Sequence, residues 1–344
     1  MNAQSDPDTR IGRFTDYLES SDLRGALAYA VGLLDDGLAV DELVLDLLAP
    51  AQALVGLRWE LGDWSVADEH AATAITEAVL AVAGARTVAI ADRGRLVLVC
   101  PEAERHSLPA RMITELLRAE GFSIVFLGAA SSKETLASFL SQFEADALIV
   151  SCSIAMNLPS AVGMLAAAKH AAVPSLCGGR AFGASADRAT MLGASGWAPD
   201  LPTAVGLFDR WRSDRPASNP ILAPGAKICG ALELAQRSVV QRCVAAHTAR
   251  ADVGVQIGLG GSESWLRDEF DAIVSSVAAT ILLDDASILI EFAHWLSQRL
   301  RHDPRIGTKA GSLLQTVTGV LADEYHAASA YLQVAMYVEG GGAA

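Results

Sequence analysis

The tripeptide Glu104-Arg105-His106 combines the two side chains that proteins use to present an imidazole to a metal ion. A neutral imidazole binds a metal through one ring nitrogen, and a carboxylate that accepts the N–H of the other nitrogen fixes the tautomer. The spacing therefore predicts His106 as a metal ligand and Glu104 as its hydrogen-bond acceptor. The alternative is a surface histidine that merely lies near an acid.

A second group of chemically capable residues precedes this loop. Trp59, Glu69 and His70 follow the pattern W-x9-E-H. Ser65 and Asp68 form a capping-box pattern, which predicts a helix that begins after Ser65 and carries Glu69 and His70 in its first turns. An indole can cover the face of a ligand, and a carboxylate can accept hydrogen bonds from hydroxyl groups. The alternative is a core tryptophan beside two polar residues on a helix surface.

The middle of the chain alternates short apolar runs with amphipathic helices. Strands are expected at 96–100, 124–127, 147–151 and 174–177, with helices near 108–120, 132–143 and 160–172. This alternation predicts a parallel, doubly wound α/β sheet whose ligand lies outside the carboxyl ends of the strands. The loop residue His106, the hydroxyl residues Ser151 and Ser153, and the pair Gly178-Gly179 all lie at or just after such ends.

The flanking regions are predicted to be helical. Apolar residues recur every three to four positions from 11 to 91, which indicates a bundle of four or five helices. Residues 213–225 hold three prolines and end in glycine, the composition of a linker. Beyond it, helices are expected at 226–252, 263–283, 284–302 and 308–338, with breaks at 258–262 and 302–304. The predicted domains are a bundle at 5–92, an α/β domain at 93–212, a linker at 213–225 and an all-α domain at 226–344.

Composition excludes several classes of protein. The net charge of -14 repels phosphate backbones and anionic lipid, so nucleic acid is not an expected partner. Five cysteines without a CxxC pattern argue against a disulfide framework and a thiolate zinc site. The chain shows no export signal and no stretch of eighteen apolar residues, so we expect a cytoplasmic protein that does not span a membrane.

A helical bundle followed by this α/β unit resembles the cobalamin-binding module of corrinoid methyl carriers and B12-dependent photoreceptors, over about residues 11–208. In that family a D-x-H-x-x-G loop supplies the lower axial histidine to cobalt, and the displaced dimethylbenzimidazole tail enters a slot in the α/β domain. Here the loop has Glu104 in place of Asp, as in light-sensing members, and Pro109 in place of Gly. The resemblance implies His106 as the cobalt ligand and a tail slot lined by Ser151, Ser153, Gly178 and Gly179.

The W-x9-E-H pattern is similar to that of B12 photoreceptors of the light-dependent repressor type. The resemblance implies that Trp59, Glu69 and His70 cap the 5′-deoxyadenosyl group, that adenosylcobalamin is the cofactor and that light is the input. Two departures stand out: no DNA-reading helix-turn-helix precedes the bundle, and Glu60 occupies the place of a second cobalt-binding histidine.

The C-terminal helices are similar in order and size to those of the photocobilins, in which a globin-like domain binds biliverdin beside the corrinoid. A bilin needs an apolar cleft, cations for its propionates and polar groups at its pyrrole nitrogens. Non-covalent binding is expected, since Cys229 and Cys243 resemble small buried hydrophobes. The candidates are Arg237, Arg242, Arg250 and Arg267 for the propionates, His247, His294 and His326 for the nitrogens or carbonyls, and Trp265, Trp295, Tyr325 and Tyr331 for the walls.

The sequence therefore predicts a photoreceptor rather than an enzyme, a homo-oligomer (dimer or tetramer) that signals to an effector protein or enzyme. One alternative is the corrinoid methyl carrier of a methyltransferase system, which leaves the W-x9-E-H pattern and the C-terminal domain unexplained. Another is a haem-binding sensor that uses His247 or His294 as the iron ligand.

Overall fold

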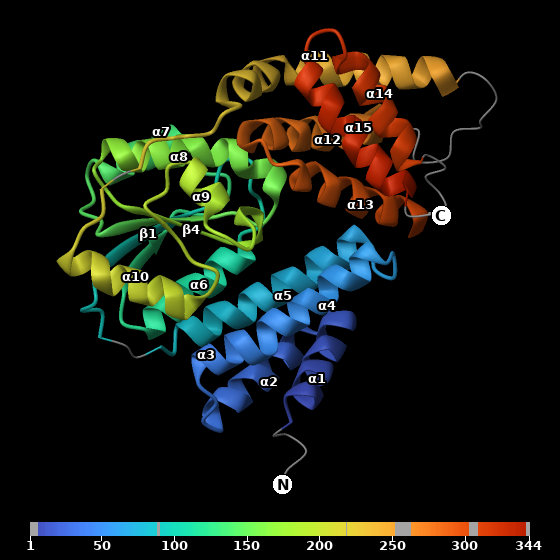
Figure 1. Ribbon diagram of the computed structural model, residues 1–344. Coiled ribbons are helices and arrows are strands. Elements are labelled where there is room, and N and C mark those ends of the chain that lie inside the picture. Colours follow the sequence, from blue (N-terminus) through green and yellow to red (C-terminus); the bar gives the residue numbers. More distant parts are fainter. Residues whose placement is uncertain (1–5, 88–89, 218, 252–262, 303–308, 342–344) are drawn as a thin grey trace.

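The computed structural model describes residues 6–87, 90–217, 219–251, 263–302 and 309–341. Figure 1 shows a helical bundle at the N-terminal end, an α/β domain beside it, and C-terminal helices packed against that domain. No helix within these ranges is long and apolar enough to cross a membrane. The predicted break at 258–262, and most of that at 302–304, lie outside the described residues.

The N-terminal bundle is built around an apolar core that includes Phe14, Leu47 and Leu80. The predicted capping box is present, because Ser65 Oγ accepts from the Asp68 N–H at 3.2 Å and the Asp68 carboxylate accepts from the Ser65 N–H at 2.9 Å. The elements are α1 (Pro7–Glu19), α2 (Leu23–Asp35), α3 (Val40–Leu43), the π-helical η2 (Val44–Leu48), α4 (Ala49–Glu60) and α5 (Val66–Gly84).

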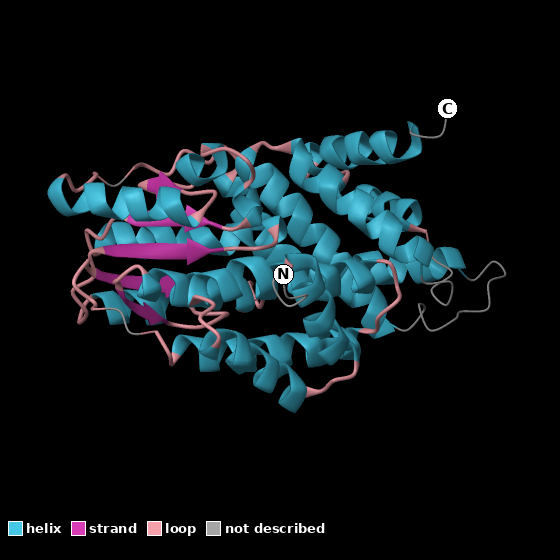
Figure 2. Cartoon of the chain, turned by 90° about the horizontal axis from the view of Figure 1, so that it is seen from below, coloured by secondary structure: helices cyan, strands magenta, loops and turns pink. Residues whose placement is uncertain are grey.

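The predicted parallel sheet is confirmed, and its four predicted strands agree with the structure to within one residue. All pairs are parallel, in the order β2-β1-β3-β4-β5, so the strand order reverses between β1 and β3. Figure 2 shows the strands side by side with helices around them. A fifth strand, β5, which was not predicted, lies at the edge of the sheet. It is too short to produce a recognisable hydrophobic periodicity in the sequence. The strands are β1 (Arg95–Val99), β2 (Ser123–Phe126), β3 (Ala147–Ser151), β4 (Ser175–Gly178) and β5 (Gly196–Trp197).

Helices cover both faces of the sheet because successive strand side chains point to opposite sides. Leu96 and Leu98 belong to the core under α6 (Leu108–Ala119) and α10 (Leu201–Ser213). Val97 and Val99 belong to the core on the other face. That face carries α7 (Lys133–Leu140), α8 (Leu158–His170) and α9 (Asp187–Met191), with the 3-10 turns η3 (Ala155–Asn157) and η4 (Arg180–Phe182) nearby.

The C-terminal region is helical, as predicted, but the prediction of a single helix at 308–338 is wrong for this segment. It is divided into two helices that pack against each other. One helix of that length would extend roughly 45 Å, whereas a turn near residue 323 lets both apolar faces reach the same core. The globin-like assignment stays a prediction. The helices are α11 (Ala226–Ala251), α12 (Glu263–Leu283), α13 (Ala286–His302), α14 (Ala310–Leu321) and α15 (His326–Gly341).

The C-terminal helices share a continuous core with one face of the α/β domain. Helix α12 is buried along most of its length and packs against η3 and α8. The buried Arg188 of α9 ties the two parts together, since it pairs with Asp285 at 2.8 Å and donates to Ser287 Oγ at 2.9 Å. The C-terminal helices are therefore held in a fixed place beside the carboxyl ends of the strands (Figure 1).

Candidate functional site

The loop after β1 presents the His106 imidazole to the surface. His106 Nδ1 lies 2.6 Å from Glu104 Oε1, which also accepts from the His106 backbone N–H at 2.9 Å. The Glu104 side chain is 0% exposed, whereas that of His106 is 57% exposed. A carboxylate acceptor at Nδ1 places the free lone pair on Nε2, the nitrogen that faces outward. The predicted ligand and its acceptor are thus brought together in the arrangement that metal coordination requires.

Glu104 also holds the loop that follows β3. Its second oxygen accepts from the backbone N–H groups of Ser153 and Ile154 at 2.8 and 3.1 Å. Asn157 Nδ2 donates to it at 3.3 Å, and the Cys152 thiol lies 3.6 Å away. One buried carboxylate therefore joins the loops that follow two adjacent strands, at the point where the strand order reverses.

Ionisation of this carboxylate is strongly favoured. Burial raises the pKa of Glu104, but the hydrogen bonds from His106 and Ser153 outweigh burial and bring it to about 2. The hydrogen bond to Glu104 raises the pKa of His106, and burial opposes that rise. Glu104 is consequently an anionic acceptor at neutral pH and holds a proton on His106 Nδ1.

The predicted tail-slot residues converge beside this loop. Ser151 ends β3 and pairs in register with Gly178 at the end of β4. Gly179 follows with φ 98°, and a Cβ there would lie 2.3 Å from the Cys152 carbonyl oxygen. Only glycine tolerates both conditions, so the backbone here stays bare and close to its neighbour.

Gly179→Ala is expected to destabilise the protein by about 1–3 kcal/mol, the usual cost of one strained backbone position, and to weaken cobalamin retention. Chemical denaturation followed by circular dichroism measures the loss. Gly206→Ala on α10, where nothing lies near the added carbon, is the matched control. Equal stability of the two variants would contradict the prediction.

The W-x9-E-H residues lie at the facing ends of α4 and α5. Glu69 contacts His70 Nδ1 through one oxygen and accepts from Thr73 Oγ1 at 2.9 Å through the other. Thr73 in turn accepts from Gln52 Nε2 of α4 at 2.7 Å. Trp59 is partly buried in the last turn of α4. Gln52 and Thr73 were not predicted from the sequence. Thr73 lies four residues after Glu69, however, and this spacing places both side chains on one helix face, where a contact can be expected.

The N-terminal bundle meets the His106 loop and the helix that follows it. The Glu69 carboxylate raises and the Arg180 guanidinium lowers the pKa of His106, which places both charges within electrostatic range of the imidazole. Glu77 of α5 contacts the start of α6, where Ser107 Oγ donates to it at 3.3 Å and Arg111 pairs with it at 3.1 Å. The bundle therefore contacts the start of α6, directly after the His106 loop, and Glu69 lies within electrostatic range of His106.

The C-terminal candidate histidines each have their own hydrogen-bond partner. His247 of α11 contacts Thr316 Oγ1 at 3.2 Å, and burial lowers its pKa. His294 of α13 lies 2.6 Å from Gln298, and His326 of α15 lies 2.6 Å from the Ala322 carbonyl oxygen. Three histidines on three helices thus have three different partners.

The remaining C-terminal candidates are divided between surface and core. Arg242 forms an ion pair with Glu324 at 2.6 Å, and Arg267 pairs with Glu263 one turn away, both on the surface. Arg237 and Arg250 are exposed on α11. The aromatic residues Trp265, Trp295, Tyr325 and Tyr331 pack against the core partly buried. A bilin site built from these residues stays a prediction.

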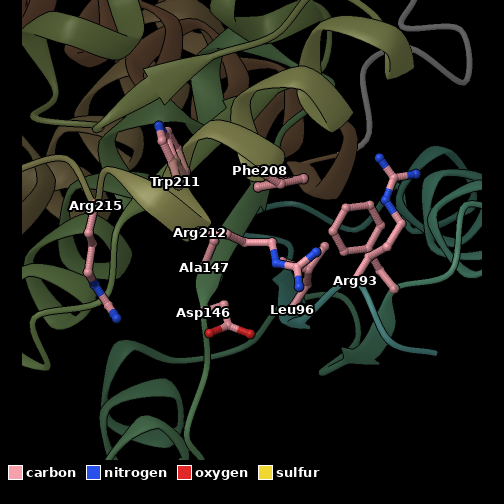
Figure 3. A pocket seen from close by; sticks show the side chains of 9 residues that line it. Arg93, Leu96, Asp146, Ala147, Phe208, Trp211, Arg212 and Arg215 are labelled. Atoms are coloured by element: carbon pink, nitrogen blue, oxygen red, sulfur yellow. The ribbon is translucent and has the colours of Figure 1, made fainter.

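A hollow of about 130 Å³ lies at the opposite end of the sheet, near the first residues of β1 and β3 (Figure 3). Arg93 on its rim pairs with Glu120 and Asp209, and Arg215 donates to the Ala172 carbonyl oxygen. These arginines bind other parts of the protein itself, and the hollow is remote from the His106 loop. Its other lining residues are Leu96, Phe122, Asp146, Ala147, Phe208, Trp211 and Arg212.

Two family matches agree with this arrangement. Residues 94–205 match a family described as B12 binding domain, and residues 11–83 match a second family with the same description. Together with the parallel sheet, these matches define a cobalamin-binding protein. A search of curated proteins finds no match to the sequence.

One solved structure of a corrinoid protein shares the fold of part of this chain, and two further structures match with lower scores. The monomethylamine corrinoid protein of Methanosarcina barkeri is 16% identical, with a TM-score of 0.52, and the match covers 60% of this chain and 99% of that one. The methanol:cobalamin methyltransferase complex MtaBC from Methanosarcina barkeri is 15% identical, with a TM-score of 0.33 and coverage of 61% and 82%. A cobalamin-binding protein from Desulfitobacterium hafniense DCB-2 is 15% identical, with a TM-score of 0.32 and coverage of 58% and 98%.

The residues of this chain fit the lower face of a corrinoid. A single exposed imidazole with a buried carboxylate behind it suits a metal ion that arrives with most of its ligands already attached. The described residues contain no group of three or more His, Cys, Asp or Glu able to hold a metal ion. At Gly178 and Gly179 the backbone lies close to the carbonyl oxygens of Ala198 and Cys152, beside the His106 loop.

Proposed function

We propose that this chain is a light sensor, not an enzyme, and that it binds adenosylcobalamin between the N-terminal bundle and the α/β domain. His106 is the lower cobalt ligand, and Trp59, Glu69 and His70 cover the adenosyl group from above. Support comes from the cobalamin-binding domains and from the Glu69 carboxylate, which lies within electrostatic range of His106.

One observation favours a sensor over a methyl carrier: the C-terminal helices reach the cap. The ring centroids of Trp59 and Trp295 are 6.0 Å apart, so α13 lies against the end of α4. A methyl carrier must offer its upper face to a methyltransferase, and a covered cap opposes that exchange. The monomethylamine corrinoid protein matches over nearly its whole length, yet leaves about two fifths of this chain without a counterpart.

The protein's own residues perform three tasks in this proposal. Bound adenosylcobalamin supplies a cobalt–carbon bond that visible light breaks. Glu104 holds His106 in the ligating tautomer, and Glu69 offers an anionic acceptor to the ribose hydroxyls. Loss of the adenosyl group would remove contacts to Trp59, Glu69 and His70 at the facing ends of α4 and α5, and the population of bundle arrangements would shift. A change in homo-oligomer assembly or in contact with an effector protein carries the signal.

A bilin such as biliverdin in the C-terminal helices would extend the response to red light. His247 and Arg250 are the best-placed pair for it, because the Arg250 guanidinium lies close enough to lower the pKa of the half-buried His247. An imidazole and a guanidinium on one helix can serve a pyrrole nitrogen and a propionate.

The test is an absorption spectrum of the protein reconstituted in darkness with adenosylcobalamin and biliverdin, desalted, and exposed to green and then red light. We expect both chromophores to be retained and the cobalt bands to change on illumination. Preference for methylcobalamin without a light response would overturn the proposal in favour of a methyl carrier. A Soret band after reconstitution with haem, with no cobalamin retained, would point to the haem sensor.

Trp59→Ala is expected to weaken adenosylcobalamin binding in the dark by about tenfold. This change in affinity corresponds to the loss of one aromatic contact at the upper end of the energy range for such contacts. Methylcobalamin binding should change little, because a methyl group does not reach the indole. Trp211→Ala, at the opposite end of the sheet, is the control. Equal losses for both corrinoids would contradict a role for Trp59 in the adenosyl cap.

A further inference from the structure

Trp295 connects the cap to the C-terminal helices. It lies on α13, and its ring is tilted by 33° against that of Trp59 in α4, at a centroid separation of 6.0 Å. In Figure 1 α13 lies next to the ends of α4 and α5, and the two helices α4 and α13 are in contact. This separation is within the range in which aromatic rings attract each other. The position of either indole therefore constrains the other.

Trp295 is itself held by residues of its own helix. The Arg299 guanidinium stands over its ring at 4.9 Å from the centroid, and the Phe292 ring lies 5.6 Å away on the other side along the helix. Residues three and four positions apart lie on one helical face, so all three side chains share the face that meets α4. A cation over the indole fixes the ring more firmly than packing alone.

Arg299 in turn is anchored in the domain core. It forms an ion pair with Glu269 of α12, a residue that is only 6% exposed. A buried carboxylate that loses its cation is strongly disfavoured, so Glu269 restrains Arg299 on this side of α13. Because α12 packs against α8 and η3, the chain of contacts begins at the α/β domain and ends at Trp59.

We infer that Trp295 is a positioning residue for the adenosyl cap, and that the C-terminal helices regulate retention of the upper ligand through the contacts Glu269–Arg299–Trp295–Trp59. This inference rests on the proposed function for the identity of the upper ligand. It goes further in assigning control of the cap to a domain that contributes no residue to the lower face. Any change that shifts α13, including ligand binding among the C-terminal helices, then alters how firmly Trp59 covers the site.

The first test measures dark affinity for adenosylcobalamin and for methylcobalamin, from the cobalt absorption bands, in the full chain. Trp295→Ala should weaken adenosylcobalamin binding about tenfold and methylcobalamin binding by less than about twofold. Trp295→Phe should restore most of the loss. Glu269→Gln should act in the same direction, although no part of it contacts the cap. Glu263→Gln, which breaks an exposed ion pair on the same helix, should change neither affinity.

The second test needs no cofactor. In the free protein, the stability losses caused by Trp59→Ala and Trp295→Ala are measured separately and together by denaturant unfolding. We expect non-additive losses, the second substitution having less than half of its effect once the first is present.

The outcomes separate this inference from the proposed function. Additive losses in the free protein, or equal weakening of both corrinoids by Trp295→Ala, would overturn the inference alone. Equal affinity of the unmodified protein for both corrinoids would overturn the adenosyl cap, and with it the assigned effect on the upper ligand. Selective weakening combined with non-additivity supports the inference.

Discussion

His106→Ala is expected to remove the lower cobalt ligand and to release most of the bound cobalamin. The imidazole Nε2 is the exposed nitrogen of a ring whose other nitrogen is fixed by Glu104, and no other imidazole lies in that loop. Loss of a hydrogen-bond partner of a metal ligand lowers metal affinity by about 10- to 100-fold, and loss of the ligand itself should lower cobalamin affinity at least as much. The measurement is the cobalt absorption spectrum of reconstituted protein after desalting, which distinguishes histidine-ligated from unligated cobalt.

His170→Ala is the matched control, because His170 is an exposed histidine at the end of α8. It should leave the spectrum and the retained cobalamin unchanged. An unchanged cobalt spectrum in His106→Ala would remove His106 from the lower face and would require another residue there.

Glu104→Gln is expected to lower the free energy of unfolding at pH 7 by about 3 kcal/mol, because the pKa of Glu104 is about 2 in the folded protein against an ordinary 4.5. A carboxyl whose folded pKa is depressed contributes stability above its unfolded pKa, and that contribution is lost as the pH falls from 4.5 towards 2. The side-chain amide of the new glutamine would also place an N–H group against the backbone N–H donors of Ser153 and Ile154, which need an acceptor there.

The check is a series of denaturant unfolding curves between pH 7 and pH 3 for the unmodified protein and the variant. The stability difference should shrink as the pH falls. Glu102→Gln, an exposed acid in the same loop, should show a small and constant difference. Parallel pH profiles for the unmodified protein and Glu104→Gln would contradict the buried, ionised state of Glu104.

Local sequence patterns predicted the helices and strands well where the hydrophobic periodicity was strong. The four main strands were found because each is a short, continuous apolar run bounded by polar residues, as expected for strands buried on both faces. The start of α5 was found because the Ser65–Asp68 box is a local interaction. The division of the last predicted helix was missed, because tertiary packing ends α14 and the local helical pattern continues through the turn.

The part of the candidate site formed by Glu104 and His106 could also be predicted from the sequence. A strand end, a carboxylate and a histidine two residues apart are enough to predict a tautomer-fixing pair, since all three belong to one loop. Cys152 and Asn157 were not predicted as partners of Glu104, because they belong to a loop about fifty residues further along. Their proximity follows only from the pairing of β1 with β3.

The sequence by itself determined the parallel sheet, the helical bundle before it and the His106 loop at the strand ends, since each depends on neighbours within a few residues. Only the tertiary structure decided that Trp295 meets Trp59 and that Arg188 binds the turn before α13. Contacts between distant segments depend on how complete elements pack to bury their apolar faces, and that packing has no local signature in the chain. The same physical reason applies to the contact between His247 and Thr316, which lie 69 residues apart in the sequence.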